Sequence, residues 1–279
     1  MDNSTGKLYI VATPIGNSRD MSPRGREILS TVDIIAAEDT RRSMVLLNKL
    51  EIRNRLVSNH KFNEYGKAKY FINEMLSGKS VAVITDAGTP CISDPGNELI
   101  RAAVEAGIKV VGVPGCCAAV TALSISGFDL SSFVFYGFFP RENAERRKLL
   151  EKLRRGDSRT FALYESPKRI MELVDFFIEA GADCRMCLCN DLTKLHELCF
   201  RGSPAEVKEQ LLAKGNYDKG EDSPYQPPKR RRAMCSTRWS IPSLPRPCWW
   251  TPWSPAAFPP RRRWPPCWPM KTIPTVRTS

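Results

Sequence analysis

The sequence has no hydrophobic run long enough to cross a membrane, since a spanning helix needs about 20 apolar residues. The apolar stretch KLYIVA at residues 7–12 is also too short for the core of a secretory signal peptide. Two nucleotide-binding patterns are missing as well: the G-x-G-x-x-G of dinucleotide-binding folds and the G-x-x-x-x-G-K-[ST] of P-loop proteins. We therefore expect a soluble, cytoplasmic protein without a membrane partner that belongs to neither of these nucleotide-binding classes.

The formal net charge of +12 is concentrated at one end of the chain. Residues 222–279 hold 11 of the 42 Lys and Arg residues but only one of the 30 Asp and Glu residues, together with all six Trp and 14 of the 22 Pro. Its apolar residues do not recur with the period of a helix or a strand, and proline cannot donate the backbone hydrogen bonds that either structure needs. We therefore expect this segment to be disordered. We interpret it as translation in a shifted reading frame. A polyproline ligand and a Trp- and Arg-rich membrane-active segment are the alternatives.

Cysteine is abundant, and four residues have the spacing C-x2-C…H-x2-C of a zinc site: Cys184, Cys187, His196 and Cys199. Zinc requires four ligands that converge on one point. The segment around Cys184 and Cys187 is typical of a strand, in which residues three apart point to opposite faces. We therefore expect reduced thiols in the core and no metal site.

Short apolar runs alternate with amphipathic segments along the first 221 residues, which is typical of an α/β fold with a mostly parallel sheet. Ser22-Pro23 has the composition of a helix start, and Asp94-Pro95 is interpreted in the same way. The expected parts are an N-terminal α/β domain, a second and apparently truncated α/β domain, and the aberrant segment: residues 1–115, 116–221 and 222–279.

Loops rich in small residues and proline follow four of the predicted strands. They are TPIGN at 13–17, TDAGTPCISDPG at 85–96, PGCCAA at 114–119 and YESPKR at 164–169. In open α/β sheets, ligands bind outside the carboxyl ends of the strands, and glycine allows the backbone to approach them closely. We interpret the loops as the wall of a ligand site, although each alone also fits an ordinary tight turn. Asp86, which ends a buried strand, suits a ligand amine or ribose hydroxyl.

Five longer motifs occur between about Lys7 and Glu221: LYIVATPIGNSRDMSPRGREIL, DIIAAEDTRRS, VAVITDAGTPCISDPG, ALYESPKRI and LTKLHE. In type and order they resemble the ribosomal RNA small subunit methyltransferase I family, a branch of the tetrapyrrole methylase (class III) superfamily. The resemblance implies a two-domain α/β homodimer that binds S-adenosylmethionine in the cleft between its domains. It also implies methylation of a cytidine 2′-hydroxyl in small-subunit (16S) ribosomal RNA, as free RNA or in the assembled subunit.

The same resemblance implies which residues line the cofactor cleft: Pro14, Ile15, Gly16, Asp86, Ala87, Gly88, Thr89, Ile92, Cys117, Ala118 and Tyr164. The family's Pro-Gly-Pro-Ser-Ala loop corresponds to PGCCA here, so Cys116 replaces a proline and Cys117 replaces a serine. A thiol forms weaker hydrogen bonds than a hydroxyl. We therefore expect weaker cofactor binding than in the family.

Methyl transfer from a sulfonium needs the ribose oxygen placed behind the methyl group and is helped by a base that removes the hydroxyl proton. The motifs contain four candidates: Glu38, Asp39, Glu165 and His196. A salt bridge with Arg41 or Arg42 is the alternative role for Glu38 and Asp39, and a structural hydrogen bond is the alternative for His196. Lys194 and His196 would share one face if their segment is a strand.

Basic residues of the motif loops are the candidates for contacts with RNA phosphates, and solvated surface is the alternative for each. They are Arg24, Arg41, Arg42, Lys168, Arg169 and Lys194.

Two other functions stay open: a methylase of the same superfamily that acts on a small tetrapyrrole, and a non-catalytic remnant that binds cofactor or RNA. The AEDTR and TKLHE motifs favour the ribosomal RNA branch. The resemblance ends at Glu221, where the family continues with an apolar strand. We therefore expect the second sheet to lack one strand and to leave a neighbouring edge unpaired.

Overall fold

The computed structural model describes residues 5–59, 64–155, 160–215 and 232–237. The first part of the chain forms a five-stranded parallel sheet in the order β3-β2-β4-β1-β5. Strands β2 and β4 are buried along their whole length, as expected for a parallel sheet covered on both faces. The strands are β1 (Lys7–Val11), β2 (Ile34–Ala37), β3 (Leu56–Ser58), β4 (Val81–Ile84) and β5 (Lys109–Val113).

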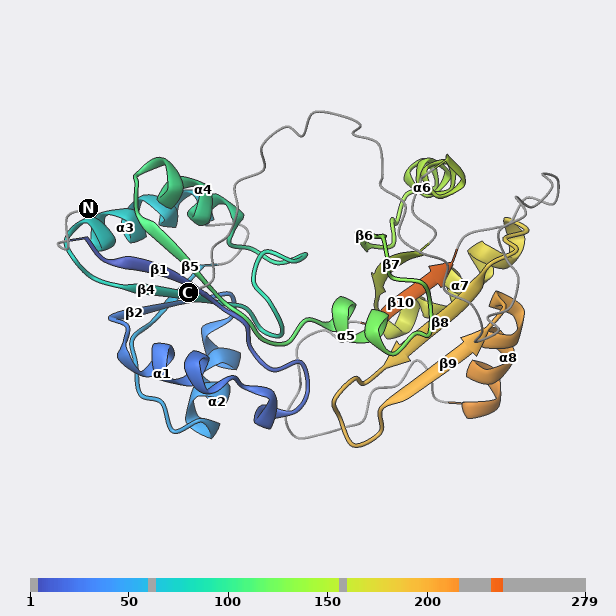
Figure 1. Cartoon of the computed structure of the whole chain (residues 1–279), viewed down its shortest axis with the longest axis horizontal. Helices are drawn as coiled ribbons and strands as arrows, with labels where there is room; N and C mark the ends of the chain where they lie inside the picture. Colours follow the sequence, from blue (N-terminus) through green and yellow to red (C-terminus); the bar gives the residue numbers. More distant parts are fainter. Residues whose placement is uncertain (1–4, 60–63, 156–159, 216–231, 238–279) are drawn as a thin grey trace, which may run out of the picture. The chain divides into compact units, whose positions relative to one another are not determined.

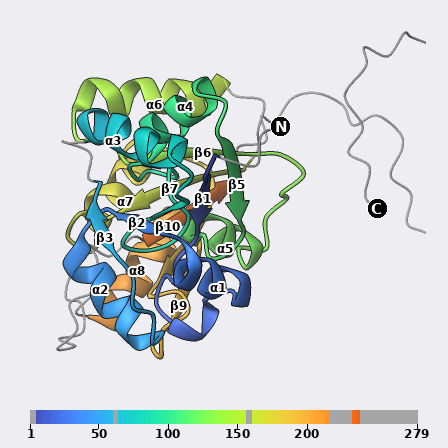
Figure 2. The same cartoon turned by 90° about the vertical axis from the view of Figure 1, so that its left-hand side faces the viewer.

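Two pairs of helices cover this sheet. Figures 1 and 2 show it between α1 (Pro23–Thr31) with α2 (Thr40–Lys49) and α3 (Glu64–Leu76) with α4 (Asn97–Glu105). On the α1/α2 side, Leu29 and Leu47 pack in one cluster with strand residues such as Ile35. On the other side, Phe71 and Leu99 pack with Leu8 and Val83. A short 3-10 helix, η1 (Ser18–Asp20), follows β1.

The second sheet is mixed and has the order β6-β7-β10-β8-β9. Strands β6 and β7 are parallel, whereas the three remaining pairs are antiparallel. Its strands are β6 (Phe133–Phe138), β7 (Thr160–Glu165), β8 (Arg185–Asn190), β9 (Leu198–Gly202) and β10 (Arg232–Thr237). The accompanying helices are α5 (Ala118–Ser124), α6 (Asn143–Arg155), η2 (Pro167–Arg169), α7 (Ile170–Glu179) and α8 (Pro204–Lys214).

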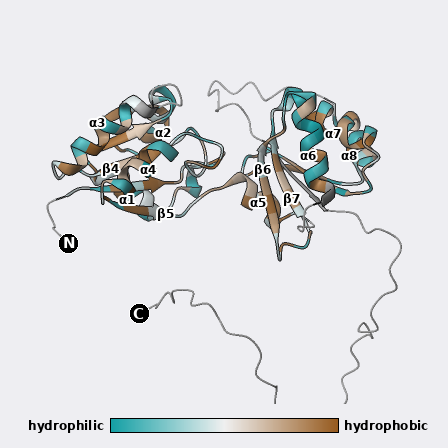
Figure 3. Cartoon of the chain, turned by 90° about the horizontal axis from the view of Figure 1, so that it is seen from above, coloured by the Kyte–Doolittle hydropathy of each residue, from teal (hydrophilic) through white to brown (hydrophobic). Residues whose placement is uncertain are grey.

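The two faces of this sheet have different cover. Helices α6, α7 and α8 pack on one face through residues such as Leu149, Phe177 and Leu211. Helix α5 packs on the other through small side chains, among them Ala119 and Ala122. Hydrophilic residues cover much of α6 in Figure 3. None of the helices in the described residues is both long and apolar enough to span a bilayer.

Strand β10 corrects the expectation that the second sheet lacks a strand. Residues Arg232–Thr237 pair antiparallel with both β7 and β8 and so fill the centre of the sheet. For these six residues the expectation of disorder in 222–279 is wrong, because neighbouring strands on both sides supply backbone partners. The rest of that segment lies outside the described residues. The proposed domain boundary at residue 115 stays a prediction.

One predicted helix start is confirmed and one is wrong. Ser22 accepts a hydrogen bond from the Gly25 N–H at 3.0 Å and caps α1, with Pro23 as the first helical residue. Asp94, in contrast, does not cap α4. That helix begins at Asn97 with Gly96 at its N-cap, where φ is 130°. This backbone conformation is essentially limited to glycine, so it places the cap two residues later than the acidic residue indicated.

Candidate functional site

The loops that follow β1 and β4 are joined at the carboxyl edge of the first sheet. The Thr13 N–H donates to the Gly88 carbonyl and the Gly88 N–H to the Thr13 carbonyl, both at 2.9 Å. The Thr13 hydroxyl also donates to the carbonyl of Thr85 at 3.1 Å. Gly88 has a φ of 87°, which a residue with a side chain adopts only with strain. The structure therefore brings the ATPIGN and DAGTP motifs together.

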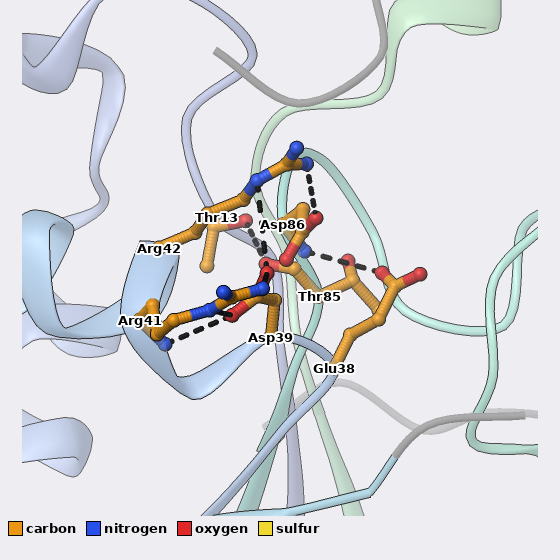
Figure 4. A network of polar contacts seen from close by, with 7 residues as sticks. All are labelled: Thr13, Glu38, Asp39, Arg41, Arg42, Thr85 and Asp86. Atoms are coloured by element: carbon orange, nitrogen blue, oxygen red, sulfur yellow. Dashed lines mark hydrogen bonds and ion pairs between the residues drawn. The ribbon is translucent and has the colours of Figure 1, made fainter. Parts of the chain in front are cut away.

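Asp86 lies at this edge with a partner on one oxygen only. Its Oδ2 accepts a hydrogen bond from Arg42 Nη1 at 2.7 Å (Figure 4). Its Oδ1 is buried and has no hydrogen-bond partner among the described residues. The Asp86 side chain is only 11% exposed. Because an unpaired buried acceptor is costly, Oδ1 is suited to a hydrogen-bond donor on a ligand.

Glu38 and Asp39 follow β2 but have different partners. Asp39 caps α2, since its Oδ1 accepts from the Arg41 N–H at 2.9 Å, and its Oδ2 lies 3.2 Å from Arg41 Nη2. The hydrogen bond from the Arg41 side chain holds the pKa of Asp39 below its ordinary value. Glu38 Oε2 instead accepts from the Asp86 N–H at 3.4 Å. Asp39 therefore has the contacts of a structural ion pair, whereas Glu38 faces the end of β4.

Two further buried oxygens lie at neighbouring strand ends, Thr85 Oγ1 and Asn59 Oδ1. Neither has a hydrogen-bond partner within the described part of the chain. Asn59 follows β3 and Thr85 follows β4, the two strands that flank β2, so the register places Glu38 between them. Asn59 lies outside the loops that the sequence predicts to form the site. The rule that ligands bind at strand carboxyl ends would have indicated it if β3 had been recognised.

The start of α5 lies beside the end of the second sheet. Thr89 Oγ1 donates to the carbonyl of Cys116 at 2.9 Å, and Cys117 is the N-cap of α5 without a side-chain capping bond. The Ala119 N–H donates to the hydroxyl of Tyr164 at 3.1 Å. Burial raises the pKa of Tyr164 far above its ordinary value. Tyr164 is therefore a neutral phenol that joins β7 to the first turn of α5.

Ile15 connects the first loop to the second sheet. It packs on the apolar cluster that contains Ala118, Tyr164 and Leu192. The other predicted cofactor residues remain near the strand ends: Pro14 and Ala87 are half-buried, and Ile92 is exposed.

Gly16 and Asn17 touch the turn between β8 and β9. The Asn17 N–H donates to Thr193 Oγ1 at 3.1 Å. A Cβ atom on Gly16 would lie 2.7 Å from Lys194 Cγ and 2.9 Å from the carbonyl oxygen of Leu192, so only glycine fits without movement. The TPIGN and LTKLHE motifs, far apart in the sequence, are therefore in direct contact.

The turn itself corrects one expectation. Lys194 and His196 do not share a strand face, because β9 begins only at Leu198. Positive φ values at Asp191 (52°) and Thr193 (67°) turn the chain here. Lys194 Nζ pairs with Asp191 Oδ1 at 2.8 Å, and His196 is exposed.

Glu165 is buried at the end of β7 and belongs to a separate group. Its Oε1 accepts from the Ser166 N–H at 2.7 Å, and its Oε2 lies 3.3 Å from Arg169 Nη1. Arg169 also donates to the Pro140 carbonyl and to Glu172, both at 3.1 Å. Burial raises the pKa of Glu165 above its ordinary value. These contacts indicate a structural role for Arg169 rather than a free phosphate-binding cation.

Replacing Glu165 by glutamine should stabilise the protein at neutral pH. With rising pH the unfolded chain releases this proton near pH 4.5, before the folded chain does, so stability falls between that value and the raised folded-state pKa. Glutamine removes this loss. We expect a higher unfolding midpoint for Glu165→Gln at neutral pH but a much smaller difference in acid. Glu172, whose pKa is lowered by a hydrogen bond from Arg146, is the matched control, and Glu172→Gln should lower the neutral-pH midpoint.

The three remaining predicted RNA-contacting residues are all exposed. Arg24 Nη2 donates to the Gly112 carbonyl at 2.7 Å, which engages part of its guanidinium group. The Arg41 side chain is 90% exposed despite its pairing with Asp39. Lys168, the middle residue of η2, is also exposed. Arg24, Arg41 and Lys168 are therefore the exposed cations of the set, whereas Arg42, Arg169 and Lys194 are half-buried.

Comparison with known proteins agrees with this arrangement. The family model for tetrapyrrole (corrin/porphyrin) methylases matches residues 7–208. The ribosomal RNA small subunit methyltransferase I of Pasteurella multocida (strain Pm70) is 43% identical over 222 residues, which is 79% of this chain and 79% of that protein. The protein of the same name from Vibrio cholerae is 44% identical and covers 78% of this chain and 76% of its own length. The Thermotoga maritima protein is 42% identical, with 72% and 90% covered.

Solved structures of the same fold are more distant in sequence. The cobalamin biosynthetic enzyme cobalt precorrin-4 methyltransferase superposes with a TM-score of 0.57 at 19% identity, over 86% of this chain and 97% of that one. Uroporphyrin-III C-methyltransferase from Thermus thermophilus, solved with S-adenosylhomocysteine, gives a TM-score of 0.53 at 13% identity, over 83% and 97%. These structures confirm the expected fold. The chain therefore belongs to the tetrapyrrole methylase family and, within it, to the ribosomal RNA small subunit methyltransferase I family.

Proposed function

We propose that this protein transfers a methyl group from S-adenosylmethionine to the 2′-hydroxyl of a cytidine in small-subunit ribosomal RNA. The names of the relatives and the shared motifs support the reaction class and the RNA substrate. The observation that carries the proposal is that several of the buried oxygens without hydrogen-bond partners in the described structure gather at one sheet edge: Asp86 Oδ1, Thr85 Oγ1 and Asn59 Oδ1. They lie at the ends of β3 and β4, on either side of β2.

The residues at this edge fit the cofactor. S-adenosylmethionine carries an ammonium group and two ribose hydroxyls, which are the donors that such oxygens require. Asp86 would accept from one of these donors, with its other oxygen held by Arg42. The paired backbones of Thr13 and Gly88 add little side-chain bulk, and Ile15 supplies an apolar contact. When bound, the cofactor supplies an electrophilic methyl group.

Glu38 is the strongest of the four base candidates. Asp39 is engaged at the start of α2, and Glu165 is buried beside Arg169. His196 is exposed on the β8–β9 turn. Glu38 alone lies at the strand edge next to Asp86. In this proposal its carboxylate accepts the ribose hydroxyl proton, while the loops hold the oxygen in line, an orientation effect worth up to roughly 7–11 kcal/mol in good cases.

RNA would be positioned through phosphate contacts by the exposed cations of the motif loops, Arg24, Arg41 and Lys168. The target cytidine, in single-stranded RNA or unstacked from its neighbours, would then reach the strand edge. A cytoplasmic homodimer that acts on the RNA or on the assembled small subunit is part of the same proposal and rests on the resemblance.

The test has two stages. Calorimetric titration of S-adenosylmethionine into the full chain should show saturable binding. A labelled methyl group should then appear as 2′-O-methylcytidine in deproteinised small-subunit RNA or in assembled subunits, and not in RNA with deoxycytidine at that nucleotide. Transfer to a tetrapyrrole but not to RNA would instead support the small-molecule methylase. Folded protein that binds cofactor or RNA but transfers no methyl group would support the non-catalytic remnant.

Replacing Cys117 by serine should stabilise the protein and strengthen cofactor binding. Cys117 is the N-cap of α5 and forms no side-chain capping bond, whereas serine is a preferred N-cap residue. We expect a gain of about 0.5–1 kcal/mol in the free energy of unfolding. Thermal unfolding checks this gain, and calorimetry checks the affinity. Cys116→Ser, one residue before the cap, should leave the stability of α5 unchanged.

A further inference from the structure

Three cysteines form a cluster on the face of β8 and β9 that α5 covers. Cys187 and Cys189 are two residues apart on β8, and Cys199 on β9 pairs directly with Cys189 in the strand register. The Cys189 sulfur lies 3.4 Å from that of Cys199 and 3.8 Å from that of Cys187. All three thiols are reduced, so their sulfurs are close to van der Waals contact without a bond.

The surroundings indicate a thiol site rather than a metal site. Cys187 and Cys189 are buried among apolar side chains such as Ala122 and Leu123 of α5, while Cys199 is half-buried. Within the described ranges, no group of three His, Cys, Asp or Glu side chains is arranged to hold a metal ion. Of the three, Cys199 alone is partly exposed to solvent.

The three thiols differ in acidity. A hydrogen bond with the Cys189 thiol, together with the nearby guanidinium group of Arg201, lowers the pKa of Cys187 to about 7. Burial raises the pKa of Cys199. Arg201 is directly opposite Cys187 in the register of β8 with β9. The nearby guanidinium group therefore favours the thiolate form of Cys187, and a thiolate is the form that reacts with peroxides.

We propose that Cys189 and Cys199 are an oxidative modification site that closes to an intrachain disulfide in the presence of hydrogen peroxide. Directly opposed residues of antiparallel strands have Cα atoms about 4.5–5.5 Å apart, inside the range of about 4.4–6.8 Å that disulfides accept. Cys187 and Cys189, two residues apart along one strand, are separated by about 6.6 Å, near the upper limit of that range. The cross-strand pair is therefore the favoured end product.

The chemistry balances without any other reactant. The Cys187 thiolate attacks one oxygen of hydrogen peroxide, the O–O bond breaks, and a sulfenic acid and hydroxide form. The Cys189 sulfur then attacks the Cys187 sulfur, and water leaves. Cys199 loses its proton to the hydroxide and attacks the Cys189 sulfur, which releases the Cys187 thiolate. One peroxide thus becomes two waters while two thiols become one disulfide.

The position of the pair gives the modification a structural consequence. Cys189 and Cys199 are the second pair of the β8–β9 hairpin counted from its turn, and this turn contains Thr193, the partner of Asn17. A covalent bond between the strands restricts opening of this turn. The modification therefore acts on the segment that contacts the TPIGN loop.

Peptide mapping of the full chain tests the proposal. Trypsin cleaves after Arg185, Lys194 and Arg201, so Cys187 and Cys189 fall in peptide 186–194 and Cys199 falls in peptide 195–201. After reduction, removal of the reductant and treatment with hydrogen peroxide, mass spectrometry should find the two peptides joined, with two hydrogens fewer than their sum. The link should disappear with dithiothreitol.

Alanine variants identify the linked pair. Cys189→Ala and Cys199→Ala should abolish the link, while Cys187→Ala should retain it and form it about tenfold more slowly, because the acidic thiol is lost. Hydrogen exchange in residues 191–198 of the oxidised wild type should slow severalfold. Oxidation of the wild type that stops at sulfinic acid, or a link that persists in Cys189→Ala, would overturn the proposal, and neither result depends on methyltransferase activity.

Discussion

Replacing Asp86 by asparagine should lower the affinity for S-adenosylmethionine by about 10- to 100-fold. Asp86 Oδ1 is a buried acceptor that lacks a partner in the described structure, while Oδ2 is held by Arg42 at 2.7 Å. A hydrogen bond to a charged group contributes roughly 1.5–3 kcal/mol, which corresponds to this range. Asparagine keeps the shape of the side chain but removes its charge. Calorimetric titration of both proteins measures the change directly.

The neighbouring carboxylate provides a matched control. Asp39 also lies near Arg42, with 3.9 Å between its Oδ2 and Arg42 Nε, but its oxygens serve the start of α2 and the Arg41 side chain. Asparagine caps helices about as well as aspartate, so Asp39→Asn should leave the affinity within about twofold. Arg42 is one-third exposed, so water can solvate it in Asp86→Asn and the fold should survive. Equal losses in both variants would remove Asp86 from the cofactor site.

The parts of the fold that the sequence predicts correctly are those with long apolar patterns. Runs such as the VAVI of β4 are buried on both faces, and a strand of this kind needs no partner information to be recognised. The sequence does not predict strand β3, because it has only three residues, all half-buried, and lacks such a run. The sequence does not predict helix α2, because its N-cap, Asp39, lies in a motif whose acidic residues are candidates for the catalytic base.

Strand β10 shows a limit of composition as a guide. Residues Arg232–Thr237 lie in a Pro- and Arg-rich segment without strand periodicity, yet they pair with β7 and β8 on both sides. A gap between two strands offers backbone donors and acceptors to any chain that can reach it. Such a position is determined by the rest of the sheet, so the local sequence does not predict it.

The sequence predicts the loops of the candidate site but not the contacts within it. Small residues and prolines after the strands predicted its loops, because that composition follows from close backbone approach. The partners within the site depend on strand register, which the sequence does not display. Glu38 beside the Asp86 N–H, and Asn59 with its unpaired oxygen, become recognisable only when β3, β2 and β4 are aligned.

Replacing Gly16 by alanine should weaken both the fold and cofactor binding. The added Cβ would lie 2.7 Å from Lys194 Cγ, 2.8 Å from Thr193 Oγ1 and 2.9 Å from the backbone oxygen of Leu192. The lysine can rotate away, but a backbone carbonyl can move only with its loop. Overpacking of this kind costs roughly 1–3 kcal/mol, and we expect a loss of that size in the free energy of unfolding. Calorimetry should show weaker S-adenosylmethionine binding, since the shift also strains the Asn17–Thr193 hydrogen bond.

A second glycine separates this steric effect from the general effect of the substitution. Gly66 lies exposed in α3, and apart from the backbone of its own helix no heavy atom of the described residues comes within 4 Å of the position that its Cβ would take. Gly66→Ala should raise the free energy of unfolding by about 0.5–1 kcal/mol, because alanine favours a helix interior. Opposite signs at the two positions would establish that the TPIGN loop packs on the β8–β9 turn in solution. A Gly16→Ala protein with unchanged stability and affinity would show that this contact does not form there, and that the turn acts independently of the first loop.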